Sequence, residues 1–271
     1  MKQKHLLLTA IATGLLIAGN LFMTGCTKEG PQGLAGKDGT NGTNGTDGTA
    51  SCIVCHSSNQ VLYAKELQSA ASMHSLGTAF ARNTGECAVC HTSQGFRGNL
   101  DGSYDWTATG AKIDNPVPPN CYTCHAIHET YEAGDLALTV SGAVALRNTN
   151  GATHDFGKGN VCASCHQGRT VEPFPVVGGA DIVVTNTRYG VHHGPQANAI
   201  AGVGMGLFEV GSGLVNSAHS TQIADACVTC HMANGSGNTS GGHTFWMGES
   251  LNTTGCTTAG CHEGEDVAAF T

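Results

Sequence analysis

The stretch Cys87-Ala88-Val89-Cys90-His91 decides the fold, because its pattern recurs along this chain of 271 residues. Five segments read C-x-x-C-H, and a sixth, Cys256 to His262, has four residues between its cysteines. Residues three apart lie on one face of a helical turn, so two thiols can bond to one group while the next histidine points at its centre. The cysteines are Cys52 and Cys55, Cys87 and Cys90, Cys121 and Cys124, Cys162 and Cys165, Cys227 and Cys230, and Cys256 and Cys261. The histidines that follow them are His56, His91, His125, His166, His231 and His262.

This pattern is the signature of covalent c-type haem attachment, in which both thiols bond to the porphyrin and the histidine binds its iron. Zinc sites, thioredoxin-like redox sites and disulfides also use paired cysteines, but none of them requires a histidine after the second cysteine. At roughly one in twenty per position, six such histidines would arise by chance with a probability of ~10⁻⁸. The sequence therefore predicts six covalently bound haem c groups.

Each haem iron has a second axial position, and its occupant separates an electron carrier from a catalyst. We expect histidines to fill five or six of these positions, which would leave those irons without an open face. The candidate distal ligands are His74, His128, His154, His192, His193, His219 and His243. In an extended segment His192 and His193 would point to opposite sides and could bind different irons. The alternatives are that one of these two is a bystander, and that Met73, Met205 or Met247 serves as a ligand.

Residues 1–25 have the features of a bacterial lipoprotein signal peptide. Lys2 and Lys4 precede an apolar run over 6–17 that is short for a transmembrane helix. The segment from Leu21 to Cys26 resembles the lipobox, where cleavage leaves a lipidated cysteine. Cys26 is the one cysteine of 13 that the haem motifs do not use. We expect a lipidated N-terminus over 26–29 and a membrane anchor on Cys26; an ordinary secretory signal is the alternative.

Residues 30–50 carry glycine at every third position, which is the period of a collagen triple helix. The segment has a single proline, Pro31, so a polar spacer is favoured over a triple helix. The remaining residues, 51–271, are rich in Gly, Asn, Thr and Ser, with a helix predicted over 61–74 and a strand over 181–185. Because aromatic residues make up only 6% of the chain, we expect porphyrin to fill the interior. The predicted fold is a multihaem cytochrome c domain, mostly loops with short helices wrapped around a stacked haem chain, and little sheet.

Together these motifs resemble the extracellular multihaem c-type cytochromes of metal-reducing bacteria, some of which polymerise into filaments. The resemblance rests on the haem motifs, on the segment Val191 to Gln196, and on Cys227 to Met232 followed by Gly242 to Phe245. It implies stacked haems and electron transfer, at the outer membrane or cell surface, to partner cytochromes or extracellular acceptors. The lipobox and the spacer depart from freely polymerising members and argue against free filament formation. A homo-oligomer or filament subunit is a further hypothesis, which is compatible with electron transfer.

The remaining composition narrows the functional classes. A net charge of −8 argues against a nucleic-acid partner, because such proteins need a basic face. No acid, base or nucleophile constellation stands out, so we expect an electron carrier and not an enzyme. The alternative is a terminal reductase with one open-site haem, and the longer sixth motif is the candidate for it.

Overall fold

The computed structural model describes residues 60–129, 131, 133–149, 151–176, 178–192, 194–204, 218–235, 237, 239–247, 253–257 and 261–264. The predicted signal peptide, Cys26, the predicted spacer, the first C-x-x-C-H motif, His193 and Met205 lie outside these residues. The chain divides into two units, Met1–Asp47 and Gly48–Thr271, and every described residue belongs to the second.

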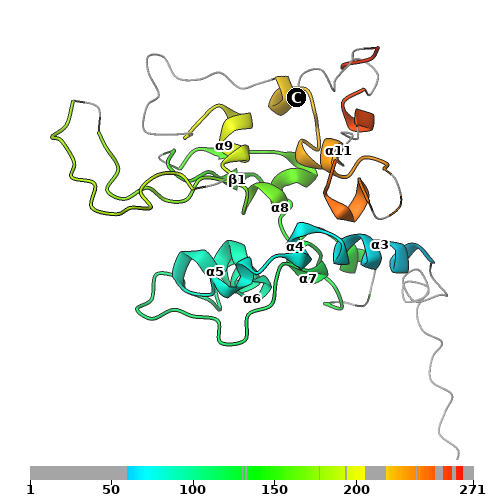
Figure 1. The fold of residues 1–271 in the computed structure, drawn as a ribbon, viewed down its shortest axis with the longest axis horizontal. Coiled ribbons are helices and arrows are strands. Elements are labelled where there is room, and N and C mark those ends of the chain that lie inside the picture. Colours follow the sequence, from blue (N-terminus) through cyan, green and yellow to red (C-terminus); the bar gives the residue numbers. More distant parts are fainter. Residues whose placement is uncertain are drawn as a thin grey trace, which may run out of the picture. The chain divides into compact units, whose positions relative to one another are not determined.

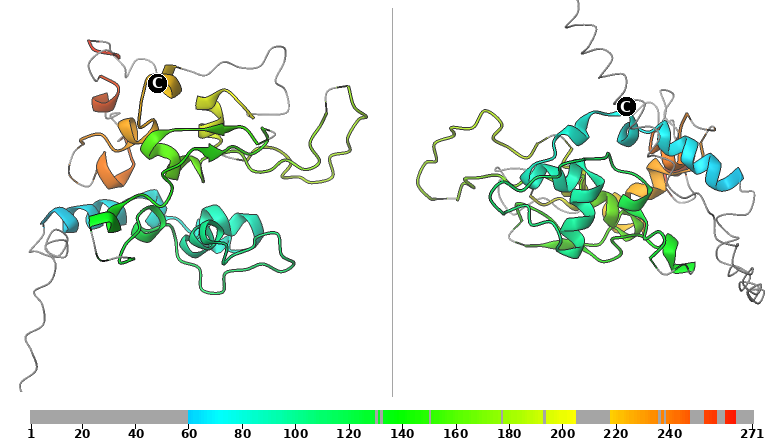
Figure 2. Two further views of the ribbon diagram at one scale, coloured as in Figure 1. Left: turned by 180° about the vertical axis from the view of Figure 1, so that it is seen from behind. Right: turned by 90° about the horizontal axis from the view of Figure 1, so that it is seen from below.

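Short helices joined by loops form the described part of the chain (Figure 1, Figure 2). The α-helices are α3 Gln60–Ala70, α4 Met73–Leu76, α5 Gly85–His91, α6 Ser93–Asp101, α7 Cys121–Cys124, α8 Asn160–Ala163, α9 Gln196–Ala201, α10 Ala218–Thr221 and α11 Cys227–His231. The 3₁₀ turns are η1 Ala79–Ala81, η2 Ala133–Leu136, η3 Gly157–Gly159, η4 Gly242–Thr244 and η5 Thr253–Gly255. Strands β1 Val144–Ala145 and β2 Thr153–His154 pair antiparallel, with Val144 opposite His154. None of these described helices is long and apolar enough to cross a membrane.

Helices α5 and α6 pack against each other, and only Thr92 lies between them along the chain (Figure 1). Thr92 caps α6 by accepting a hydrogen bond from the Gly95 backbone N–H at 2.9 Å, which satisfies one of the free donors of the first turn. Gly102 ends α6 in the left-handed conformation that favours glycine. A Cβ on Gly95 would lie 2.3 Å from the Ala88 carbonyl oxygen, so only glycine permits this close approach of the helices. These contacts hold α6 against α5, which carries the second C-x-x-C-H motif.

One cluster of buried apolar residues is made largely of small side chains. Four of its seven members are alanines, and Phe156, 1% exposed, is the largest. Outside this cluster the described part of the chain also buries Val89 and Phe96. Meanwhile α3 and α4 leave large apolar side chains exposed, including Leu62 and Leu76. A large apolar group bound along these segments would bury that surface. The cluster consists of Val144, Leu146, Phe156, Ala163, Ala197, Ala201 and Ala226.

The predicted secondary structure holds where it depends on local pattern. The segment 61–74 is helical in two pieces, α3 and the start of α4, which are interrupted where the Ser72 hydroxyl donates to the Ser69 carbonyl at 2.6 Å. The strand predicted over 181–185 is wrong. That segment forms no ladder with any described strand, and Val183 and Val184 are exposed, because an apolar run becomes a strand only when a neighbour pairs with its backbone.

Candidate functional site

The C-x-x-C-H motifs within the described residues are built on helical turns, as their spacing predicts. The second lies on α5, the third on α7, the fourth at α8 and the fifth on α11. Asn120 fixes the start of α7, because its side chain accepts from the Tyr122 backbone N–H at 3.0 Å and its own N–H donates to the Thr123 hydroxyl at 2.9 Å. In the longer sixth motif, the His262 backbone N–H donates to the Cys256 carbonyl at 3.2 Å. The second, third, fourth and fifth motifs thus have cysteines on or beside a short helical turn.

All ten motif cysteines in the described part of the chain are free thiols. Thiols of different motifs nevertheless meet: Cys90 interacts with Cys165, and Cys162 with Cys227. A third contact joins Cys230 to Cys256. The second motif therefore adjoins the fourth, the fourth adjoins the fifth, and the fifth adjoins the sixth. Groups attached to these cysteines would lie next to one another.

Two motif histidines have one ring nitrogen held by a backbone carbonyl. His125 Nδ1 lies 2.8 Å from the Leu136 carbonyl oxygen, and His231 Nδ1 lies 3.2 Å from that of Phe245. A carbonyl oxygen only accepts, so each Nδ1 donates in this contact. This arrangement is the usual outer-shell support of a metal-binding imidazole.

Four of the motif histidines face a spare histidine from elsewhere in the chain. Every pair joins one C-x-x-C-H or C-x4-C-H histidine to one predicted distal ligand, and the ring centroids are separated by nearly the same distance in all four. The pairs are His74 with His166 at 6.0 Å, His91 with His192 at 6.2 Å, His125 with His243 at 6.2 Å, and His219 with His262 at 6.2 Å.

This separation fits an iron between the rings. Imidazoles bind metals at ~2.0 Å, and a ring centre lies a further ~1.1 Å behind its nitrogen, so two rings on opposite sides of one iron have centroids ~6.2 Å apart. Ring pairs without a motif histidine lie closer in the described part of the chain, from 4.5 Å for His154 with Phe156 to 5.8 Å for His243 with Phe245. Among the described residues no group of three or more His, Cys, Asp or Glu side chains is placed to hold a metal ion. The side chains fit haem.

The predicted distal ligands His154 and His128 have other surroundings, and burial affects His243 of the third-motif pair. The Nε2 atom of His154 is buried without a hydrogen-bond partner, which is costly for a polar atom unless something binds it. The ring of His128 stacks on Tyr131 at 5.4 Å. Burial lowers the pKa of His243 to about 4, which keeps its ring in the neutral form that binds metal. His193 and the first motif, with Cys52, Cys55 and His56, lie outside the described residues.

A cavity of about 200 Å³ lies beside the fifth motif. Ile200, Ile223 and Ala226 form its apolar wall, while Cys227, Cys230, His231 and His219 supply its sulfur and nitrogen atoms. Apolar side chains beside two thiols and two imidazoles suit the face of a porphyrin. His231 belongs to the fifth motif, whereas His219 is a spare histidine whose ring lies 6.2 Å from that of His262 in the sixth.

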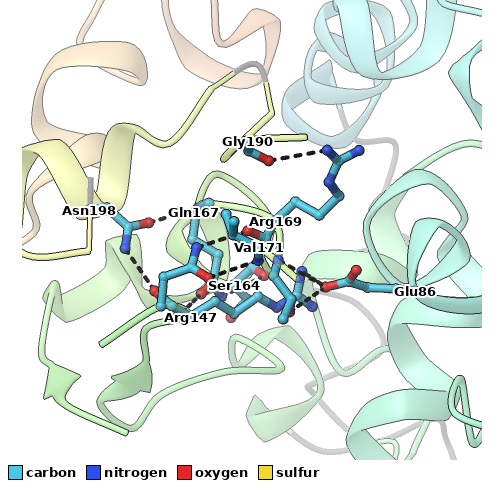
Figure 3. Close-up of polar contacts among 11 residues, drawn as sticks. Glu86, Arg147, Ser164, Gln167, Arg169, Val171, Gly190 and Asn198 are labelled. Atoms are coloured by element: carbon cyan, nitrogen blue, oxygen red, sulfur yellow. Dashed lines mark hydrogen bonds and ion pairs between the residues drawn. The ribbon is translucent and has the colours of Figure 1, made fainter. Parts of the chain in front are cut away.

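A polar network that the cysteine and histidine motifs did not predict joins the regions of the second and fourth motifs (Figure 3). Arg147 Nη1 lies 2.9 Å from Glu86 Oε1, and the Arg147 backbone N–H donates to Gln167 Oε1 at 2.9 Å. Arg169 donates from its backbone to the Val191 carbonyl at 2.9 Å and from its guanidinium to Gly190 at 3.1 Å and to Arg188. The loop that carries His192 is thereby tied to the residues after the fourth motif. In the sequence, the only sign of this network is Glu86 directly before Cys87, which stands out because only 12% of the residues are charged.

Comparison with known protein families, with characterised proteins and with solved structures finds no match to this chain.

Proposed function

We propose that this chain is a hexahaem c-type cytochrome that carries electrons and does not itself transform a substrate. The observation that supports this most directly is the set of four histidine pairs at 6.0–6.2 Å, each of which includes a motif histidine. When bound, each haem iron supplies a one-electron redox couple. The chain's own part would be to hold two imidazoles on the iron at the second, third, fourth and sixth motifs and to bring attachment motifs together, as at Cys90 with Cys165.

Paired imidazoles favour a carrier over a reductase. An iron with histidine on both faces has no open position for a substrate, and the residues around it have only to keep it low-spin. The sixth motif was the candidate for an open site, but its histidine, His262, faces His219 at 6.2 Å. We therefore favour electron transfer at this motif also.

The first test is haem content combined with EPR on the oxidised, purified protein. We expect six covalently bound haems per chain by intact mass, all low-spin. A variant with Cys121→Ala and Cys124→Ala should lose one haem by mass and keep the others. A chain that matures without haem would refute the proposal, and a stoichiometric high-spin signal would favour the reductase alternative.

The cellular setting is part of the same proposal. We place the chain as a lipoprotein of the outer membrane or cell surface, anchored through Cys26 and separated from the anchor by residues 30–50, where it passes electrons to partner cytochromes or extracellular acceptors. The motifs near Cys26 and the resemblance to surface cytochromes support this placement. A Cys26→Ser variant should leave the membrane fraction and lose lipid label while keeping its haems. Electron microscopy of the wild type would reveal filaments if the filament-subunit hypothesis is right.

A further inference from the structure

Phe245 adopts an unusual backbone conformation directly after η4. Its φ of 55° places it in the left-handed region, which bulky side chains rarely occupy. The surrounding loop holds it there: the Gly241 N–H donates to the Trp246 carbonyl at 2.7 Å, and the Trp246 N–H donates to the Thr244 hydroxyl at 3.1 Å. Strain of this kind persists only where the surrounding structure enforces it, and it often marks a functional position.

The Phe245 ring touches two histidines from different pairs. Its centroid lies 5.0 Å from that of His74 at an interplanar angle of 70°, and 5.8 Å from that of His243 at 58°. These are edge-to-face and tilted contacts, which aromatic rings prefer. His74 faces His166 of the fourth motif, and His243 faces His125 of the third. One side chain therefore contacts the distal histidines of two sites.

The backbone of the same residue reaches a third site. The Phe245 carbonyl oxygen lies 3.2 Å from Nδ1 of His231, the histidine of the fifth motif. The fourth and fifth motifs also adjoin each other directly, through Cys162 and Cys227. Because the ring and the carbonyl group are both attached to the Phe245 Cα, a displacement of this Cα would disturb the contacts to all three sites.

We propose that Phe245 is a positioning residue that sets the imidazole orientations of three neighbouring haems; this rests on the proposed function. An aromatic edge against an imidazole restricts rotation of that imidazole about its bond to the metal. The relative orientation of the two imidazole planes controls the g-anisotropy of a low-spin ferric haem, and ligand hydrogen bonding tunes its reduction potential. Phe245 acts on the third and fourth haems through its ring and on the fifth through its carbonyl.

The test uses the purified, haem-loaded protein. Phe245→Leu removes the aromatic ring and keeps the carbonyl, so we expect changed g-values and shifted midpoint potentials for two of the six low-spin haems. The haem content should stay at six per chain. Phe245→Tyr keeps the ring and should restore the wild-type spectrum. Trp246→Leu is the matched control, because Trp246 is the neighbouring aromatic residue, is 54% exposed, and should leave the spectrum unchanged.

Several outcomes would overturn the inference. A Phe245→Leu protein with six haems and a wild-type EPR spectrum would show that the ring positions nothing. Equal changes in Phe245→Leu and Trp246→Leu would indicate a general disturbance of the loop. Either result would leave the proposed function intact, whereas a wild-type chain without haem would remove that function itself.

Discussion

The ion pair between Glu86 and Arg147 offers the sharpest test of how the motifs are held together. Arg147→Met removes the guanidinium and keeps most of the aliphatic stem. The two charges lie 2.9 Å apart, and their side chains are only 21% and 22% exposed. At an effective dielectric of ~20 the attraction at this distance is about 6 kcal/mol, but desolvation offsets most of it. An exposed pair contributes at most about 1 kcal/mol, and breaking a fully buried one costs about 3–5 kcal/mol.

We therefore expect Arg147→Met to lower the free energy of unfolding by about 2 kcal/mol, since this pair is largely but not fully buried. The assay is guanidinium unfolding of the haem-loaded protein, carried out as a double-mutant cycle with Glu86→Gln. The coupling between the two changes should be about 1–2 kcal/mol. Lys112→Met is the control, because it breaks an exposed pair with Asp114, in which the side chains are 52% and 85% exposed.

The cycle has a clear failing result. If Arg147→Met destabilises the protein no more than Lys112→Met does, or if the coupling is zero, the Glu86–Arg147 contact does not join the second motif to the region of the fourth. The neighbouring hydrogen bond from the Thr170 hydroxyl to Glu86, at 3.0 Å, would then be the contact to test next.

Three further predictions concern stability. Gly95→Ala should cost about 1–3 kcal/mol, because the new Cβ would meet the Ala88 carbonyl, while Gly142→Ala, with open space around it, should cost far less; thermal unfolding compares the two. Asn198→Ala should cost about 2 kcal/mol or more in the same measurement, because Asn198 is fully buried and its amide bonds both Gly168 N–H and the Arg147 carbonyl. The hydrogen bond from Lys158 Nζ lowers the pKa of Asp225. The ionised Asp225 carboxylate therefore adds to the free energy of unfolding above the usual pKa of ~3.9, and this contribution is lost as the pH falls through the lowered pKa. Unfolding of wild type and Asp225→Asn should therefore differ near neutral pH and converge in acid; a constant difference would contradict this sign.

Local chemistry was readable from the sequence. The C-x-x-C-H spacing predicts a helical turn because residues three apart share a face, and α5, α7 and α11 carry such turns. The helix expected over 61–74 is found for the same reason, although Ser72 interrupts it. The expected strand over 181–185 failed because strand formation depends on a partner that composition does not reveal.

The pairing of histidines was decided only in three dimensions. Motif spacing identified His91, His125, His166 and His262 as one half of each pair, because they directly follow a cysteine. Their partners come from distant segments, and seven spare histidines gave no local pattern with which to choose among them. Periodicity arguments extend over a few residues, whereas loop closure brings segments of any separation together at a cost that grows only slowly with length. The sequence by itself thus determined which residues form the C-x-x-C-H motifs and which histidines lie outside them, and the tertiary packing around Phe245 and Arg147 decided which of them meet.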